Sequence, residues 1–190
     1  LQYIKEKKHI VEPDYLNRHW GGLRESTQKD FDKSIETGVS KKILDRISKA
    51  MVTVPDSFSL FSKMKKLLLQ RSTLYENDTV DWAMAEQLAF GSLLDEGHSV
   101  RMSGQDSQRG TFSHRHAYIK DEHSEQIYIP LNEISKKQAT LSIYNSFLSE
   151  YCVMGFEFGY SMAQPNALTI WEGQFGDFAN GAQIIIDQFL

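Results

Sequence analysis

Two histidines in the stretch SGQDSQRGTFSHRHA, residues 103–117, are the first candidates for chemistry. His114 and His116 are two residues apart, so an extended backbone would place both side chains on one face. Zinc would need a third and usually a fourth ligand. The remaining candidates are His98, His123 and the single cysteine, Cys152, and no spacing ties them to this stretch. We therefore expect no metal site in this chain.

The same stretch is a poor candidate for a phosphate-binding loop. Its glycines, Gly104 and Gly110, lie too far apart, and the Lys-Ser/Thr pair that ends such loops is missing. The residues alone leave the role of this loop open.

A second group of candidates lies in NSFLSEYCVMGFEFGYSM, where Glu150 falls in the first turn of an otherwise apolar helix. The helix macrodipole favours a carboxylate at that position by about 0.3–1 kcal/mol. Periodicity alone therefore favours a structural role for Glu150 over a functional one.

A third group lies in WEGQFGDFANGAQ, where Phe175 and Phe178 are three residues apart and Gln174 stands beside them. These side chains could line an aromatic pocket with one polar group. They could equally belong to an ordinary core between a helix and a sheet.

The elements that must position these residues alternate between helix and strand after residue 79. Helical patterns occupy residues 79–97, 149–164 and 175–190, and strand-like stretches cover 98–104, 125–133, 138–146 and 167–174. We expect the strand at 167–174 to be buried. This alternation predicts an α/β fold, a mostly parallel sheet flanked by helices.

The first 78 residues differ in character from the rest. They hold 15 basic and 11 acidic side chains, whereas residues 79–190 hold 6 and 14, which suggests two regions. Amphipathic helical segments dominate the first region, one of them led by Ser40. We predict a helical linker or extension at 1–78 that joins an upstream domain. Residues 79–190 are predicted to form a domain that continues beyond the last residue.

Composition narrows the classes of partner. A formal charge of −4 and a pI near 5.9 argue against nucleic acid, and no apolar run approaches the roughly 20 residues that cross a bilayer. One cysteine allows no internal disulfide and fits a reducing compartment. We expect cytoplasmic location in a bacterium, or the mitochondrial matrix in a eukaryote.

Three stretches taken together resemble a known family, the first components of 2-oxoglutarate dehydrogenase complexes. They are VDWAMAEQLAFGSLLDEGHSVRMSGQDSQRGTFSHRHA, LSEYCVMGFEFGYSMAQPNAL and WEGQFGDFANGAQIIIDQF. They follow one another in the family's order and spacing and cover residues 79–190. The family consists of thiamine-diphosphate-dependent decarboxylases, and the matching region is their pyrimidine-binding domain, of the transketolase-like type.

The resemblance implies a catalytic role for Glu150, as the acid that hydrogen-bonds the ring nitrogen of the cofactor's aminopyrimidine. It further implies that the cofactor is contacted by Gln105, Leu148, Gln174, Phe175 and Phe178, with Phe178 stacked on the ring. His114 and His116 belong to the matching loop, and the resemblance places them near the substrate without a defined step.

The resemblance also implies what lies outside the chain. Magnesium would be held by a Gly-Asp-Gly…Asn motif that is missing here, and the active site would form between two subunits of a homodimer. The full enzyme would decarboxylate 2-oxoglutarate and pass a succinyl group to the lipoyl group of a partner succinyltransferase. The alternatives are an enzyme for 2-oxoadipate, one carbon longer, and a non-catalytic binding or assembly module.

Overall fold

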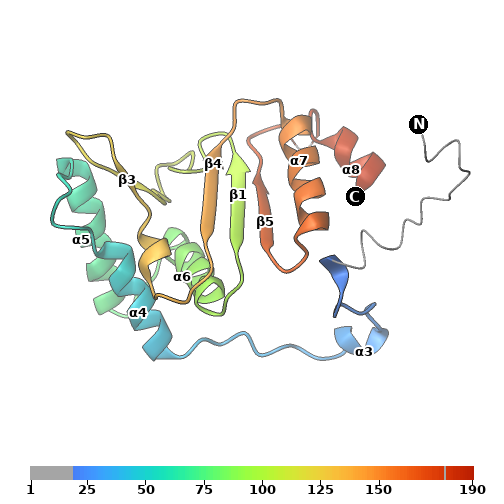
Figure 1. The fold of residues 1–190 in the computed structure, drawn as a ribbon, viewed down its shortest axis with the longest axis horizontal. Helices are drawn as coiled ribbons and strands as arrows, with labels where there is room; N and C mark the ends of the chain where they lie inside the picture. The colour runs from blue at the N-terminus through green and yellow to red at the C-terminus, as the bar shows by residue number, and fades with distance from the viewer. Residues whose placement is uncertain (1–18, 178) are drawn as a thin grey trace, which may run out of the picture.

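A parallel three-stranded sheet forms the centre of the chain in the computed structural model, which describes residues 19–177 and 179–190 (Figure 1). Its strands are β1 (Val100–Gly104), β4 (Leu141–Asn145) and β5 (Leu168–Glu172), in the order β4-β1-β5. Val100 lies opposite Leu141 on one side and Leu168 on the other. The predicted α/β fold with a mostly parallel sheet is confirmed.

The two faces of β1 have different partners because side chains alternate along a strand. Val100 and Met102 face the apolar core, whereas Arg101 and Ser103 face the helix α7 (Glu150–Ala163) through Glu157. Arg101 Nε donates to Glu157 Oε2 at 2.7 Å, and Ser103 Oγ donates to Glu157 Oε1 at 2.7 Å. The helix α8 (Gln183–Phe189) packs against α7.

The apolar face of the sheet is covered by α6 (Trp82–Asp95), and α4 (Lys41–Val52) packs against α6 in turn. Helix α5 (Ser62–Glu76) lies beside α4. The close approach of α4 and α6 requires Gly91, since a Cβ there would overlap the side chain of Ile47. The buried members of the core are Ile47, Met51, Met84, Leu88, Phe90, Leu94, Val100, Met102, Ala117, Leu131, Ile134, Leu141 and Ile143.

Helix α4 comes from the segment predicted as a linker, yet Ile47 and Met51 are fully buried in this core. Burial of each such side chain stabilises the fold by about 1.5–3 kcal/mol. Upstream, α3 (Gln28–Phe31) is short, and Trp20 Nε1 donates to the carbonyl oxygen of Met162 at 2.7 Å. The domain boundary at residue 78 remains a prediction.

A small antiparallel pair, β2 (Ile119–Lys120) and β3 (Ile127–Tyr128), lies outside the main sheet. A strand was predicted at 125–133, but within that range only Ile127–Tyr128 form one. Pro130 has no N–H to donate to a ladder, and the chain turns there into the 3₁₀ helix η1 (Pro130–Glu133). Within the described ranges, no helix has the length and apolar character needed to cross a membrane.

The expectation of a buried strand at 167–174 is wrong. None of the five residues of β5 is fully buried, because β5 pairs only with β1 among the described residues and so lies at an edge of the sheet. Its Leu168 is 38% exposed. Trp171 and Glu172, the last two residues of this strand, nevertheless belong to the candidate site.

Candidate functional site

The candidate site lies where the three parallel strands end. Gln105 follows β1, Ser146 and Phe147 follow β4, and Gly173 and Gln174 follow β5. Since parallel strands all end at one edge of a sheet, the loops after them meet there, and α/β proteins generally bind ligands at this edge. Helix α7 begins at the same edge and brings Glu150 to it.

Glu150 is the buried acid of this site, with 8% of its surface exposed. Gln105 Nε2 donates to Glu150 Oε1 at 2.7 Å, and Trp171 Nε1 donates to Glu150 Oε2 at 3.0 Å. Each carboxylate oxygen can accept more than one hydrogen bond, so Glu150 keeps capacity for a ligand donor. The predicted helix start at Glu150 is confirmed, and Ser149 occupies the N-cap position.

Gln174 ties the loop after β5 to the loop after β1. Its Nε2 donates to the carbonyl oxygen of Gln105 at 3.1 Å, and its Oε1 accepts from Thr111 Oγ1 at 2.8 Å. Its backbone N–H donates to Asp177 Oδ2 at 2.5 Å. The structure therefore brings Glu150, Gln105 and Gln174 into one hydrogen-bonded group.

Gly104 allows this contact between loops. Its φ of +154° is rarely adopted by residues with a side chain, and a Cβ would overlap the carbonyl oxygen of Glu172. The same Cβ would lie 2.8 Å from Ser107 Oγ. A glycine is required here for the backbones of β1 and β5 to approach each other as they leave the sheet.

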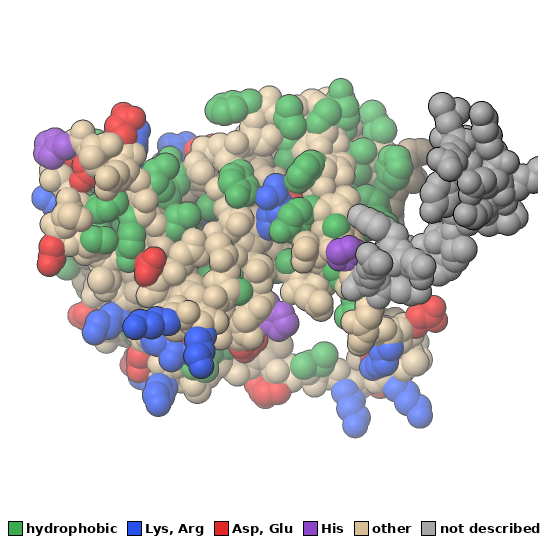
Figure 2. All heavy atoms as spheres, viewed as in Figure 1, with side chains coloured by type: hydrophobic (Ala, Val, Ile, Leu, Met, Phe, Trp, Pro, Cys, Tyr) green, Lys and Arg blue, Asp and Glu red, His purple; other side chains and the backbone are tan. Residues whose placement is uncertain are grey.

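Exposed apolar side chains surround the polar group. Leu148 is 59% exposed, Phe147 is fully exposed, and Phe175 lies with its ring centroid 6.4 Å from that of Phe112. Figure 2 shows hydrophobic side chains gathered over this end of the sheet and along α7. Phe178, predicted to stack on a cofactor ring, lies outside the described residues. Apolar surface of this extent commonly marks a binding surface.

Three hollows open at this edge, and the one of about 220 Å³ has Asn145, Ser146 and Leu148 in its lining. Another, of about 440 Å³, is lined by Gln105, Asp106, Asn145, Ser146 and Phe147. The third, of about 180 Å³, is lined by Thr111, Phe112, His114, Glu172, Gly173, Gln174 and Phe175. Glu150 lines none of these three hollows, but a flat ring with hydrogen-bonding nitrogens could meet the amides of Gln105 and Gln174 and the aromatic side chains there.

Arg115 holds the loop in place, and sequence reasoning missed it. Its guanidinium is buried and donates to Glu86 at 2.6 and 2.9 Å, to Glu172 at 2.6 and 2.7 Å, and to the carbonyl oxygen of Ser107 at 2.7 Å. Burial lowers the pKa of Arg115, but the hydrogen bonds to both carboxylates outweigh it and raise the pKa above its ordinary value. The arginine thus joins α6, the 105–117 loop and the end of β5.

The two histidines flanking Arg115 do not share a face, so the expectation from an extended backbone is wrong. Ser113, just before His114, and His116 itself have positive φ angles of 55° and 41°, so this stretch is not extended. His114 lines the hollow beside Gln174, and its Nδ1 is buried with no hydrogen-bond partner among the residues that the structure describes. His116 lines a different pocket, against α5. Only His114 is close to the Glu150 group.

No group of three or more potential metal ligands occurs within residues 19–177 and 179–190. Cys152 is exposed on α7 and forms no disulfide. The residues that the Glu150 group offers to a ligand are a carboxylate, amides and aromatic rings.

Comparison with known proteins identifies the domain. The sequence profile of the family described as "Transketolase, pyrimidine binding domain" matches residues 78–190. The mitochondrial 2-oxoglutarate dehydrogenase of Schizosaccharomyces pombe is 50% identical over 182 residues, which are 93% of this chain and 18% of that protein.

Two bacterial relatives give a similar picture. The 2-oxoglutarate dehydrogenase E1 component of Rickettsia typhi is 45% identical over 190 residues, which are all of this chain and 20% of that protein. The E1 component of Brucella ovis is 47% identical over 178 residues, 93% of this chain and 18% of that protein. The chain spans about a fifth of the length of these curated relatives.

Proposed function

This chain belongs to the family of transketolase pyrimidine-binding domains, and on that premise we propose that it forms the pyrimidine-binding half of a thiamine-diphosphate-dependent 2-oxo acid decarboxylase. The observation that carries the proposal is the buried carboxylate of Glu150, held between the Gln105 amide and the Trp171 indole where the parallel strands end. The names of the relatives support 2-oxoglutarate as the substrate of the complete enzyme.

The donor set fits the aminopyrimidine of the cofactor. Glu150 would accept a hydrogen bond from the protonated ring nitrogen, and Gln105 and Gln174 would lie along the ring edge. Phe175, Phe178 and Leu148 would supply apolar surface. When bound, thiamine diphosphate supplies a carbon nucleophile and an electron sink for the loss of carbon dioxide.

Glu150 has a defined task in this proposal, which is to hold a proton shared with the ring nitrogen. The N–H groups of Gln105 and Trp171 fix the orientation of the Glu150 carboxylate, so that the shared proton would lie at one position relative to the ring nitrogen. Gln174 fixes Gln105 in turn through its backbone carbonyl. The exposed aromatic side chains around the site would exclude water once covered.

The rest of the active site is expected in other parts of the protein. Magnesium and the diphosphate would be held by a separate domain, and the site would be completed by the partner subunit of a homodimer. The succinyl group would pass to the lipoyl group of a succinyltransferase component. Relatives of both bacterial and mitochondrial origin support the bacterial cytoplasm or the mitochondrial matrix as the location.

The experiment that tests the proposed substrate is a comparison of two acids. The intact protein that carries this chain, supplied with thiamine diphosphate and magnesium, should release carbon dioxide from 2-oxoglutarate faster than from 2-oxoadipate. Faster turnover of 2-oxoadipate would assign the longer substrate. No release from either acid would favour a non-catalytic binding or assembly module of the same fold.

A second measurement tests whether the chain carries only half of a site. The isolated chain of 190 residues should not decarboxylate 2-oxoglutarate with the same cofactors. Measurable turnover by the isolated chain would contradict this division of the active site.

A further inference from the structure

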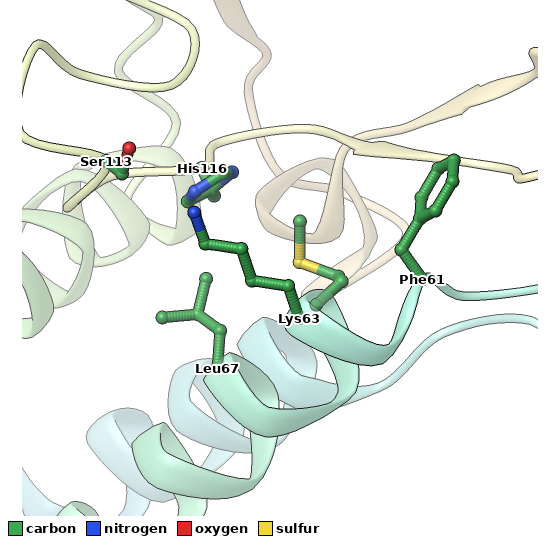
Figure 3. A pocket seen from close by; sticks show the side chains of 6 residues that line it. Phe61, Lys63, Leu67, Ser113 and His116 are labelled. Carbon is green, nitrogen blue, oxygen red and sulfur yellow. The ribbon is translucent and has the colours of Figure 1, made fainter.

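We propose that the pocket between α5 and the loop around His116 binds a small monocarboxylate with an apolar chain, at a site separate from Glu150. The pocket has a volume of about 370 Å³ and is lined by Phe61, Lys63, Met64, Leu67, Ser113 and His116 (Figure 3). Its size is within the range of small-molecule sites. Neither Glu150 nor any residue hydrogen-bonded to it lines this pocket.

The apolar part of the ligand is indicated by one side of the pocket. Phe61, Met64 and Leu67 come from the start of α5 and the residue before it, on the side of the helix turned toward the loop. Phe61 is 49% exposed. An apolar chain laid across these three side chains would remove exposed apolar surface from water.

The anionic part of the ligand is indicated by the charges. Figure 3 shows the Lys63 side chain extending across the pocket toward His116. Lys63 has no ion pair within the part of the chain that the structure describes. The buried guanidinium of Arg71, whose charge acts on His116, donates to the carbonyl oxygens of Arg115 and His114 and is also under the influence of the Asp81 charge. No carboxylate lines the pocket to balance these cations.

The pocket continues past His116. A second hollow of about 190 Å³ shares Phe61, Met64 and His116 with it and also contacts Arg109 and Lys120. Asp106 is the nearby acid that faces His116, and it is already paired with Arg109. Lys120 is likewise paired, with Glu125, so Lys63 remains as a cation at His116 with no ion-pair partner among the described residues. A carboxylate at His116 would meet this charge, while its chain follows the apolar side.

His116 gives the site a pH dependence. Burial lowers the pKa of His116, and the charges of Arg71, Lys63 and Arg109 lower it further, against the opposing charge of Asp106. A carboxylate bound beside the ring would raise that pKa, so binding takes up a proton. The affinity for a carboxylate should then rise as the pH falls from 8 to 6, a range in which the ligand stays ionised.

The test is calorimetric titration of the intact protein with octanoate, and with 1-octanol as the uncharged analogue. Octanoate should bind saturably, more tightly than the alcohol, and more tightly at pH 6 than at pH 8. Lys63→Met should weaken octanoate binding by about tenfold. Lys65→Met is the matched control, because Lys65 is exposed on the same helix and does not line the pocket.

A second pair of variants tests the apolar side. Leu67→Gln should weaken octanoate binding, whereas Leu69→Gln, at a position 68% exposed outside the pocket, should not. The proposal is overturned if octanoate shows no saturable binding. That result is expected if another segment of the protein fills the pocket. Equal affinity for octanol, or equal effects of the lysine variants, would overturn it as well. None of these outcomes depends on the decarboxylase activity.

Discussion

Replacing Arg115 by methionine removes the cation that joins three parts of the candidate site. Methionine keeps much of the length and apolar volume of the side chain but leaves Glu86 and Glu172 facing each other without their shared partner. The loop 105–117 would lose its bonds to both α6 and the end of β5. We expect this loop to open and Gln105 to lose its fixed position.

The magnitude follows from burial. The Arg115 side chain is 2% exposed, whereas Glu86 and Glu172 are 27% and 23% exposed. Breaking a buried ion pair costs about 3–5 kcal/mol. Because both carboxylates keep some contact with water, we expect a loss of about 3 kcal/mol, the lower end of that range.

The assay is hydrogen exchange of the loop amides in the intact protein. The N–H groups of Arg115, His116 and Ala117 donate to the carbonyl oxygens of Arg109, Arg109 and Gln108 at 2.9, 2.9 and 2.8 Å. A loss of about 3 kcal/mol should speed their exchange by about 100-fold where they exchange by local opening.

The matched control for this experiment is Arg109→Met. Arg109 lies in the same loop but its side chain is 47% exposed. It pairs with Asp106 and donates to Ser113 Oγ at the surface, so its loss should cost much less than the loss of Arg115. Adding Glu86→Gln and Glu172→Gln to Arg115→Met should restore part of the protection, because the unpaired charges are then gone. Equal exchange rates in the two methionine variants would refute the reasoning.

Three further changes test other parts of the structure. Trp171→Phe removes the indole donor to Glu150 and should lower the decarboxylation rate by about tenfold, measured as kcat at saturating cofactor. Gly104→Ala places a Cβ against the carbonyl oxygen of Glu172 and should lower both the unfolding temperature and the activity. Asp121 accepts backbone N–H bonds from Ser124, Ser59 and His123, which hold its pKa well below the usual range. The stability it contributes is present above the unfolded pKa near 4 and is lost as the pH falls through the folded pKa, so Asp121→Asn should flatten the acid side of the stability profile.

Local sequence patterns were sufficient to predict the strands and the helix that carry the candidate site. The parallel strands and the helix starting at Glu150 could be predicted from hydrophobic periodicity and strand-forming residues. The edge position of β5 could not, because periodicity does not reveal how many neighbours a strand has. The helix α6 shows the same limit at finer scale, since the helical pattern begins at residue 79 but the helix is capped by Asp81 and starts at Trp82, which is 92% exposed.

The part of the site that sequence reasoning missed depends on long-range contacts. Arg115 lies 29 residues from Glu86 and 57 residues from Glu172, and no local spacing signals either pair. Near His114 and His116, left-handed backbone occurs at Ser113 and at His116 itself, neither of which is glycine. Such conformations are held by surrounding contacts and leave little trace in the local sequence.

The central claim is that Glu150 does chemistry at a cofactor ring, and Glu150→Gln tests it most directly. The glutamine keeps the size of the side chain and can still accept from Trp171, but it cannot share a proton as a carboxylate does. The control is Glu96→Gln, an exposed position at the end of α6. Hydrogen exchange across the sheet should be the same in both variants.

The decisive quantity is the rate of carbon dioxide release from 2-oxoglutarate by the intact protein with thiamine diphosphate and magnesium. Glu150→Gln should lower this rate by about 100-fold or more, while Glu96→Gln leaves it unchanged. A Glu150→Gln protein that is folded, binds thiamine diphosphate and decarboxylates at the unaltered rate would contradict the account.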